Sequence, residues 1–170
     1  MQWISVPSPI GALGVAADEG EITNIHFGGV GRHQHSGGVG RQPVAADPAP
    51  VLRRAKEQLD AYFAGELTDF DLPLAAPSGP DYEKSVWKVI ATIGYGDMMT
   101  YGEIATALGD PTAARAVGVA CNHNPVPIVV PCHRVVGAGG KLVGFGGGLD
   151  RKRHLLALEA RVRVERDFFQ

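Results

Sequence analysis

The first third of the chain alternates short apolar runs with turn residues, a pattern typical of a β-meander. Runs rich in Ile, Val and aromatic residues predict strands at residues 3–6, 14–17 and 22–27. Between residues 48 and 64 the apolar positions recur at helical spacing instead. We expect this segment to form a helix that covers the sheet, with Asp47 as its N-cap and Gly65 at its end. Residues 70–74 predict a further strand.

A stretch rich in Pro, Ser and Gly at residues 75–80 predicts a boundary between two domains. Residues 1–75 are expected to form a sheet with one helix, and residues 81–170 a second, mostly helical domain. The apolar spacing in this second domain predicts helices at residues 82–93, 100–108, 112–120 and 150–163. Thr100 and Glu103 have the spacing of a capping box, and Asp110 precedes the next helix as its start signal. The predicted fold class is α+β.

Residues 28–47 form a Gly-rich segment in which Gly-Gly-Val-Gly-Arg occurs twice. Because the repeat is short and rich in Gly, we expect a flexible insertion within the first domain. His33 and His35 lie in it and are metal-ligand types, but a solvated loop is the simpler interpretation. No metal site is expected.

The two helices predicted at residues 100–108 and 112–120, joined by a tight Gly-containing turn, have the outline of a helix-turn-helix. The second helix is rich in Ala and Gly, so it can approach another surface closely but offers little with which to read base edges. Tight packing inside the protein is the alternative explanation for these small residues.

Charge is distributed unevenly along the chain, whose net charge is −2. Residues 1–80 contain five Lys/Arg and nine Asp/Glu, whereas residues 81–170 contain eleven and nine. Since nucleic-acid binding depends on cationic side chains, the C-terminal half is the better candidate for such a surface.

No stretch approaches the roughly 20 apolar residues that cross a bilayer, and the first residues lack the pattern of a secretion signal. The expected location is therefore cytoplasmic, with no membrane partner. Cys121 and Cys132 are the only cysteines, which argues against a disulfide framework and excludes a four-cysteine zinc site.

Cys132 and His133 carry the strongest chemical signal, because they interrupt an apolar, strand-like run at residues 128–136. In a strand, neighbouring side chains point to opposite faces, so burying one of this pair turns the other outward. That arrangement favours a reactive site in which the thiol is ionisable at neutral pH. An ordinary buried thiol is the alternative that the pair alone leaves open.

Four segments taken together resemble the O6-alkylguanine-DNA alkyltransferases. They are Pro131-Cys132-His133-Arg134, Asn124-Pro125-Val126-Pro127-Ile128, Ala113-Ala114-Arg115-Ala116-Val117-Gly118 and Gly144-Phe145-Gly146-Gly147-Gly148, and the similarity extends in order over residues 82–159. The resemblance implies an N-terminal ribonuclease H-like α/β domain. It also implies a C-terminal domain with a helix-turn-helix and an active-site strand and loop.

The function implied by this resemblance is direct DNA repair. Such a protein flips an O6-alkylguanine out of the duplex and transfers the alkyl group irreversibly to its own Cys132. It is a methylated-DNA–protein-cysteine S-methyltransferase that reacts once per molecule, because a thioether is a very poor leaving group. No cofactor is implied, and activity on O4-alkylthymine stays open.

The resemblance assigns catalytic roles to single residues. Cys132 would be the acceptor, and His133, oriented by Glu159, would draw the thiol proton through a water. Tyr101 would help to rotate the phosphate and would donate a hydrogen bond to the base. Asn124 would lock the turn before the active-site strand.

The implied partner is double-stranded DNA, bound through its minor groove with little sequence specificity. Arg115 would fill the gap left by the flipped nucleotide, and Tyr101 would contact the backbone. The small residues that allow close approach are Ala114, Ala116 and Gly118. We expect a monomer, and cooperative binding along DNA stays open.

The implied base pocket forms around the Gly-rich residues 144–148. Its expected lining residues are Val135, Phe145, Gly146, Gly147 and Trp87. Some relatives have Tyr and Ser at the positions of Phe145 and Gly146, which puts tolerance of bulky alkyl groups in question. The side chains considered for phosphate contacts are Lys141, Arg151, Lys152 and Arg153, with a solvated face as the alternative.

Three other functions fit part of the pattern. An alkyltransferase-like protein that binds lesions without repairing them would lack the active cysteine, which this chain keeps. A Cys-His hydrolase would have no use for the small-residue helix with its single Arg. A helix-turn-helix regulator would need polar base-reading residues where this chain has Ala. Alkyl transfer is therefore the predicted function.

Overall fold

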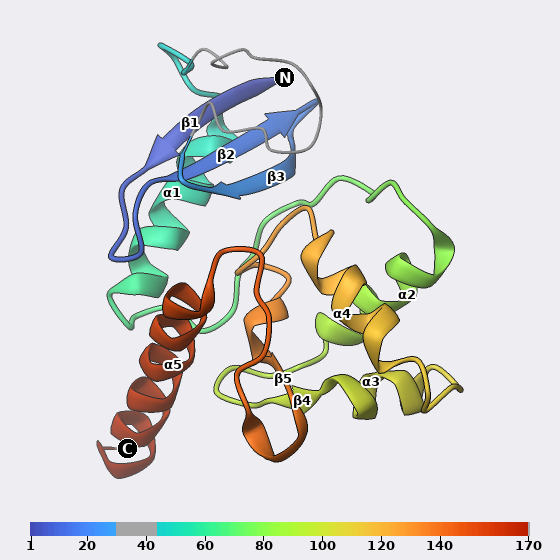
Figure 1. Ribbon diagram of the computed structural model, residues 1–170. Coiled ribbons are helices and arrows are strands. Elements are labelled where there is room, and N and C mark those ends of the chain that lie inside the picture. The colour runs from blue at the N-terminus through green and yellow to red at the C-terminus, as the bar shows by residue number, and fades with distance from the viewer. Residues whose placement is uncertain (30–43, 170) are drawn as a thin grey trace. The chain divides into compact units, whose positions relative to one another are not determined.

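The computed structural model describes residues 1–29 and 44–169. The chain divides into two compact units, Met1–Pro77 and Ser78–Gln170 (Figure 1). Most of the flexible insertion expected at residues 28–47, including His33 and His35, lies outside the described residues.

The first unit is an antiparallel sheet of three strands with one helix against it (Figure 1). β1 (Gln2–Val6), β2 (Leu13–Asp18) and β3 (Glu21–Phe27) pair in chain order. α1 (Pro50–Phe63) contacts all three strands. Apolar side chains on the strands and on the helix form the core of this unit; the fully buried ones include Val6, Leu13, Val15, Leu52 and Leu59.

Helix α1 begins two residues later than its apolar pattern predicts. Its N-cap residue is Ala49, which makes no side-chain cap, so the prediction of Asp47 as N-cap is wrong. Pro50 stands in the first turn, where its missing N–H costs no hydrogen bond. Gly65 follows the helix with a positive φ of 77°, the conformation that ends helices and that Gly adopts most easily.

The strand expected at residues 70–74 is reduced to one bridge between Leu74 and Ile22. Earlier in this segment, both backbone groups of Asp71 are hydrogen-bonded to the side chain of Gln58. The Gln58 amide donates to the Asp71 carbonyl and accepts from the Asp71 N–H, at 2.9 Å each. Pro73 has no N–H to add to a ladder. The segment therefore bonds to β3 only around Leu74, where the Ile22 N–H donates to the Pro73 carbonyl at 2.8 Å.

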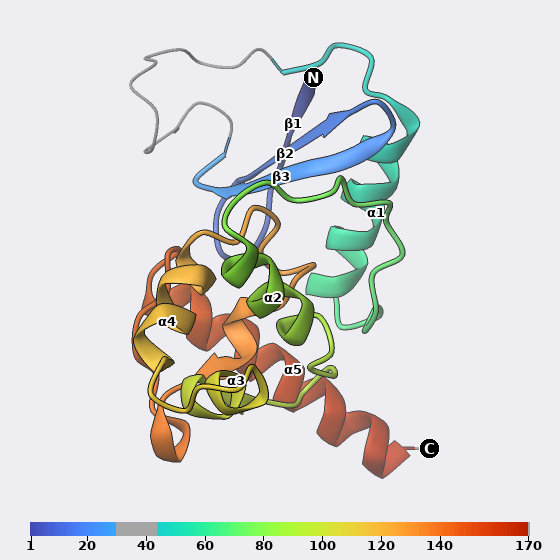
Figure 2. The ribbon, with the colours of Figure 1, turned by 90° about the vertical axis from the view of Figure 1, so that its right-hand side faces the viewer.

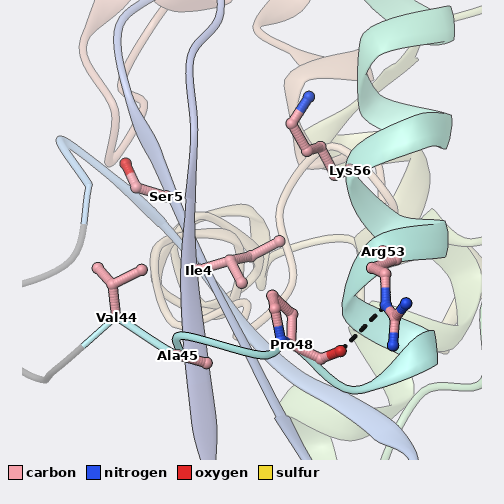
Figure 3. Close-up of a pocket in the computed structure, with 7 residues that line it drawn as sticks. All are labelled: Ile4, Ser5, Val44, Ala45, Pro48, Arg53 and Lys56. Carbon is pink, nitrogen blue, oxygen red and sulfur yellow. Dashed lines mark hydrogen bonds between the residues drawn. The ribbon is translucent and has the colours of Figure 1, made fainter.

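A pocket opens on the first unit between β1, the segment before α1, and α1 itself (Figure 3). Its lining residues are Ile4, Ser5, Val44, Ala45, Pro48, Arg53 and Lys56. The Arg53 guanidinium donates to the Pro48 carbonyl at 3.1 Å, which links α1 to the segment before it. None of these residues belongs to the predicted site.

The second unit is built mainly from helices (Figure 2). They are α2 (Asp81–Ile90), α3 (Tyr101–Ala107), α4 (Ala114–Asn122) and α5 (Leu149–Phe169). Between them β4 (Met99–Thr100) pairs in parallel with β5 (Val135–Val136). Two 3₁₀ turns flank β5, namely η1 (Cys132–Arg134) and η2 (Ala138–Gly140). A buried apolar cluster that includes Val86, Ile90, Ile104 and Val117 joins α2, α3 and α4.

The predicted capping box at α3 is confirmed. The hydroxyl of Thr100 accepts from the Glu103 N–H at 3.0 Å, and the Glu103 carboxylate accepts from the Thr100 N–H at 3.2 Å. α4 starts at Ala114 rather than residue 112 because the Asp110 carboxylate binds both the N–H and the hydroxyl of Thr112, which fixes a turn first. The two helices and this turn form the predicted helix-turn-helix.

The lengths of α2 and α5 differ from the predicted ones. α2 ends at Ile90 instead of residue 93, where the Thr92 hydroxyl donates to the Val89 carbonyl at 2.6 Å. α5 continues to Phe169 instead of residue 163, because no Gly or Pro interrupts this segment. None of the described helices is both long and apolar enough to span a bilayer.

Replacing Thr100 by Ala removes one half of the capping box. We expect the free energy of unfolding to fall by about 0.5–2 kcal/mol, because two N–H groups at the start of α3 lose their partners or their positioning. Urea unfolding followed by circular dichroism measures the change. Thr106→Ala is the matched control, since its hydroxyl only donates to the Gly102 carbonyl inside the same helix. Equal stability of both variants would contradict the expectation.

Candidate active site

Cys132 and His133 lie in the 3₁₀ turn η1 rather than in a strand. Pro131 has no N–H for a ladder, and its carbonyl accepts from the Arg134 N–H at 3.0 Å, which closes the turn. The strand predicted over residues 128–136 is therefore wrong except for β5. Because successive side chains of a 3₁₀ turn do not alternate between two faces, Cys132 and His133 are both buried, at 4% and 0% exposure.

The His133 imidazole is paired with the Glu159 carboxylate deep in the second unit. His133 Nε2 and Glu159 Oε2 are 2.6 Å apart, and both side chains are fully buried. Glu159 lies on α5 on the same face as Leu155 and Val162, four residues before it and three after it. The helix therefore turns this acid inward, where the sequence pattern alone would suggest an exposed one.

The Glu159 carboxylate also accepts from Arg134 and Gly96. The Arg134 guanidinium contacts it through Nε at 2.8 Å and Nη2 at 3.1 Å, and the Gly96 N–H does so at 3.1 Å. Burial alone would raise the pKa of Glu159, but the hydrogen bonds and charges of His133 and Arg134 outweigh it and lower the pKa to about 2. The carboxylate is therefore ionised at neutral pH.

An ionised partner fixes the tautomer of His133. Burial is the main cause that lowers the pKa of His133, against the opposing effect of Glu159, so the ring is neutral at neutral pH. Since an ionised carboxylate only accepts hydrogen bonds, Nε2 carries the proton and Nδ1 carries a lone pair. Nδ1 is buried and has no hydrogen-bond partner among the described residues. It is thus a base with an open acceptor position.

The Cys132 thiol is protonated in the free protein. Burial raises its pKa to about 11, against smaller lowering effects of a hydrogen bond from Asn124 and of the Lys152 charge. The expectation of a thiol ionisable at neutral pH is wrong for this state, because a buried sulfur loses the solvation that a thiolate needs. A reaction at this sulfur has to remove its proton as part of the reaction.

The loop before η1 is held by Asn124. Its side chain accepts from the Val126 N–H at 3.0 Å and donates to the Val130 carbonyl at 2.8 Å. Between these two contacts Ile128 has a φ of 74°, which costs a β-branched residue backbone strain. Asn124 therefore locks a strained turn directly before the cysteine.

The helix-turn-helix contributes Tyr101 at the start of α3 and Arg115 in the first turn of α4. The Tyr101 hydroxyl donates to the Val143 carbonyl at 2.9 Å, and burial raises its pKa to about 12. Arg115 and Ala116 are exposed, whereas Ala114 and Gly118 are half-buried. A side chain at Gly118 would meet the Tyr101 ring at 3.9 Å, so this glycine faces α3.

Residues 141–148 follow η2 without regular structure. Phe145 is half-buried, Gly146 is exposed, Gly147 is buried, and the Gly147 carbonyl accepts from Arg151 at 3.0 Å. Val135 is fully buried in the cluster that also contains Cys132. Trp87, also expected in the pocket, belongs to the same cluster, and its indole N–H donates to the Ala120 carbonyl at 2.8 Å.

The four side chains considered for phosphate contacts differ in exposure. Lys141 and Arg153 are exposed, and Arg151 is half-buried. Lys152 is fully buried, so its assignment to phosphate is wrong. It faces inward because α5 carries it one turn before Leu155, on the buried side of the helix.

Comparisons with known proteins identify the family of this chain. Residues 81–161 match the model of the 6-O-methylguanine DNA methyltransferase DNA-binding domain. Residues 1–76 match the ribonuclease-like domain of 6-O-methylguanine DNA methyltransferase. The chain belongs to the 6-O-methylguanine DNA methyltransferase family.

Relatives of this methyltransferase family cover nearly the whole chain. A methylated-DNA–protein-cysteine methyltransferase of Mycolicibacterium paratuberculosis is 48% identical over 95% of this chain and 93% of its own. One of Methanosarcina acetivorans is 44% identical over 94% of this chain and 98% of its own. A crystal structure of Mycobacterium tuberculosis OGT in complex with DNA is similar, with 46% identity, a TM-score of 0.82, and coverage of 95% and 94% of the two chains.

Replacing Glu159 by Gln in this methyltransferase tests the buried carboxylate. We expect the free energy of unfolding at pH 7 to fall by about 3–5 kcal/mol, because Arg134 stays buried without an anion. The folded-state pKa of about 2 lies below the ordinary 4.5, so the stabilisation is complete above pH 4.5 and is lost towards pH 2. The difference between parent and variant should therefore shrink over that window.

Urea unfolding at several pH values measures this difference. Glu165→Gln, an exposed carboxylate on the same helix, is the control and should stay within about 0.5 kcal/mol of the parent. A Glu159→Gln protein as stable as the parent at pH 7 would show that the network contributes no stability.

Proposed function

We propose that this protein repairs O6-alkylguanine in DNA by transferring the alkyl group to Cys132. The observation that carries the proposal is the state of the His133 ring, which directly follows the buried Cys132 in the chain. The ring is neutral, its Nε2 is hydrogen-bonded to Glu159, and its Nδ1 has a free lone pair. This is the arrangement of nucleophile, base and orienting acid that activates a weak nucleophile. Family membership over both domains supports the same reaction.

The transfer step balances without a cofactor. His133 Nδ1 takes the thiol proton through a water molecule, and the sulfur attacks the alkyl carbon. The sulfur–carbon bond forms as the bond from carbon to O6 breaks, and the departing guanine takes up one proton. The products are S-alkylcysteine and unmodified guanine, and since the thioether has no route back to a thiol, each molecule reacts once.

The high pKa of Cys132 has a use in this scheme. A thiol with a pKa of about 11 is almost entirely protonated at neutral pH and reacts slowly with other alkylating agents. The proton leaves only when a substrate is aligned with both the sulfur and the base. Asn124 supports this step by holding the turn before Cys132 and by its hydrogen bond to the sulfur.

DNA is proposed to bind along the helix-turn-helix through its minor groove. Arg115 is exposed on α4 and makes no ion pair among the described residues, so it is available to enter the base stack where the nucleotide leaves. The side chain of Ala116 beside it is small, and so are those of Ala114 and Gly118. The backbone of α4 can therefore approach the DNA closely. Without polar base-reading side chains on this face, binding has little sequence specificity.

The flipped base is proposed to lie against residues 144–148. Phe145 offers a ring for stacking, and the exposed Gly146 offers a main-chain N–H to the O6 atom. Val135 and Gly147 are buried and support this wall from inside. Tyr101 donates to the base once its hydroxyl leaves the Val143 carbonyl. The protein acts as a monomer.

In the decisive experiment, the protein is incubated with a duplex oligonucleotide that contains one O6-methylguanine. The mass of the intact protein is then measured by mass spectrometry. We expect the mass of one added methylene group, located on the peptide that contains Cys132. Cys121→Ala, which removes the other cysteine, should still accept one methyl group, whereas Cys132→Ala should accept none. Transfer to Cys121, or no transfer by the parent protein, would refute the proposal.

Arg115→Ala should slow repair of the lesion in a duplex by about tenfold or more, because the gap in the base stack stays empty and the flipped state loses a few kcal/mol. Transfer from free O6-benzylguanine should be unchanged, since no base pair has to open. Single-turnover rates with both substrates measure the effect. Lys88→Ala, at an exposed cation on α2, is the control. Equal losses with both substrates would assign Arg115 another role.

A further inference from the structure

Lys152 is a buried cation without an acidic partner. Its side chain is fully buried, and among the described residues it makes no ion pair with a carboxylate. Buried lysines are rare unless they are paired, because an ammonium group loses its hydration. Arg134, the other buried cation of this unit, has its carboxylate in Glu159. The position of Lys152 therefore needs another explanation.

The contacts of Lys152 fit the charged form. Its Nζ donates to the carbonyls of Val135 at 2.6 Å and Gly144 at 3.3 Å, and to the Tyr101 hydroxyl at 3.4 Å. The Tyr101 hydrogen is already donated to Val143, so the oxygen of this hydroxyl is the acceptor. An ammonium group has three N–H donors for these three acceptors, whereas a neutral amine has two.

Two aromatic rings complete the surroundings of this ammonium. Nζ lies 5.6 Å from the centre of the Tyr101 ring and 5.8 Å from that of Phe145, within the range of cation–π attraction. Both rings belong to the proposed base pocket. Lys152 therefore connects α5 to β5, α3 and the wall at residues 144–148 with a single group.

The titratable groups that interact with Lys152 belong to the same site. They are Cys132 and His133 of η1, Cys121 of α4 and Tyr101 of α3. No carboxylate is among them. Of these groups, Cys132 is the one that gives up its proton in the proposed reaction, so its sulfur gains from the nearby cation as negative charge develops.

We propose that Lys152 is a positioning residue for alkyl transfer, which holds Tyr101 and Phe145 in place and lends its positive charge to the Cys132 sulfur as the proton leaves. This inference rests on the proposed function. From the neutral thiol, the reacting complex gains negative charge on the sulfur and then on the departing guanine. A fixed cation in a water-poor site favours that state over the resting one.

Two uncharged variants of Lys152 separate the effect of its charge from the effect of its side-chain volume. Lys152→Met keeps the length of the side chain, and Lys152→Gln keeps N–H donors for a carbonyl. Both should lower the single-turnover rate of methyl transfer from O6-methylguanine duplex by about tenfold or more at saturating DNA, equivalent to roughly one unit of thiol pKa. Lys88→Gln, at an exposed lysine on α2, is the control and should keep the parent rate.

A second measurement reads the charge at the sulfur directly. Iodoacetate and iodoacetamide have similar size but differ in charge, and each forms a sulfur–carbon bond as iodide leaves. Offered together, they label Cys132 in a ratio that the local charge sets, read by mass spectrometry of that peptide. A nearby ammonium favours iodoacetate, so the parent should exceed a short cysteine peptide in this ratio, and both Lys152 variants should fall severalfold below the parent.

Each result decides the inference. A lower transfer rate together with a lower labelling ratio supports it. A parent-like rate in a folded Lys152 variant overturns it, and so does a lower rate with an unchanged ratio, which would show a purely structural role. If neither variant folds, a parent ratio no higher than that of the peptide overturns it and a higher one supports it. Failure of the parent to transfer a methyl group would instead refute the proposed function.

Discussion

The buried carboxylate of Glu159 joins three parts of the second unit that are far apart in sequence. Its hydrogen-bond donors come from η1, through His133 and Arg134, and from the loop before β4, through Gly96. Arg134 in turn donates to the Ile93 carbonyl at 2.6 Å, so the same network reaches the turn after α2. Burying a carboxylate costs several kcal/mol, and only donors that are fixed in place offset this cost. These donors are therefore fixed around the carboxylate.

This network decides the chemistry of the cysteine. An ionised Glu159 keeps the His133 proton on Nε2, which leaves Nδ1 as the basic atom. The opposite tautomer would turn the lone pair to a carboxylate that cannot donate. The charge of Glu159 thus sets both the orientation of the His133 ring and the position of its free lone pair. His133 is neutral and can accept a proton at Nδ1.

The buried cations Arg134 and Lys152 differ in how their charge is compensated. Arg134 is neutralised by Glu159 and serves the scaffold, because its charge is already paired. Lys152 is surrounded by carbonyls and rings, which stabilise an ammonium without cancelling its charge. Meanwhile burial keeps the Cys132 proton in place. A site built in this way stays unreactive until a substrate is bound, which suits a protein that can react only once.

The sequence by itself determined the elements with strong local signals. Helical spacing gave α1, the Thr100–Glu103 pair gave the start of α3, and the ordered motifs around Cys132 gave the family and the proposed site residues. Signals of this kind lie within a few residues of one another, so they can be read along the chain. The 3₁₀ turn at Cys132 could not be predicted from the sequence, because an apolar run that contains Pro131 is compatible with both a strand and a buried turn.

Only the tertiary structure decided the electrostatics. Lys152 follows Arg151 and precedes Arg153, and nothing in these neighbours distinguishes the buried cation from the surface ones. What buries it are the contacts of its side chain with β5, α3 and the segment at residues 144–148. In the same way, the raised pKa of Cys132 and the open Nδ1 of His133 depend on solvent exclusion by residues distant in sequence, such as Val86 of α2 in the core cluster of Cys132. Burial and charge pairing arise from groups that meet only when the chain folds, so no local pattern specifies them.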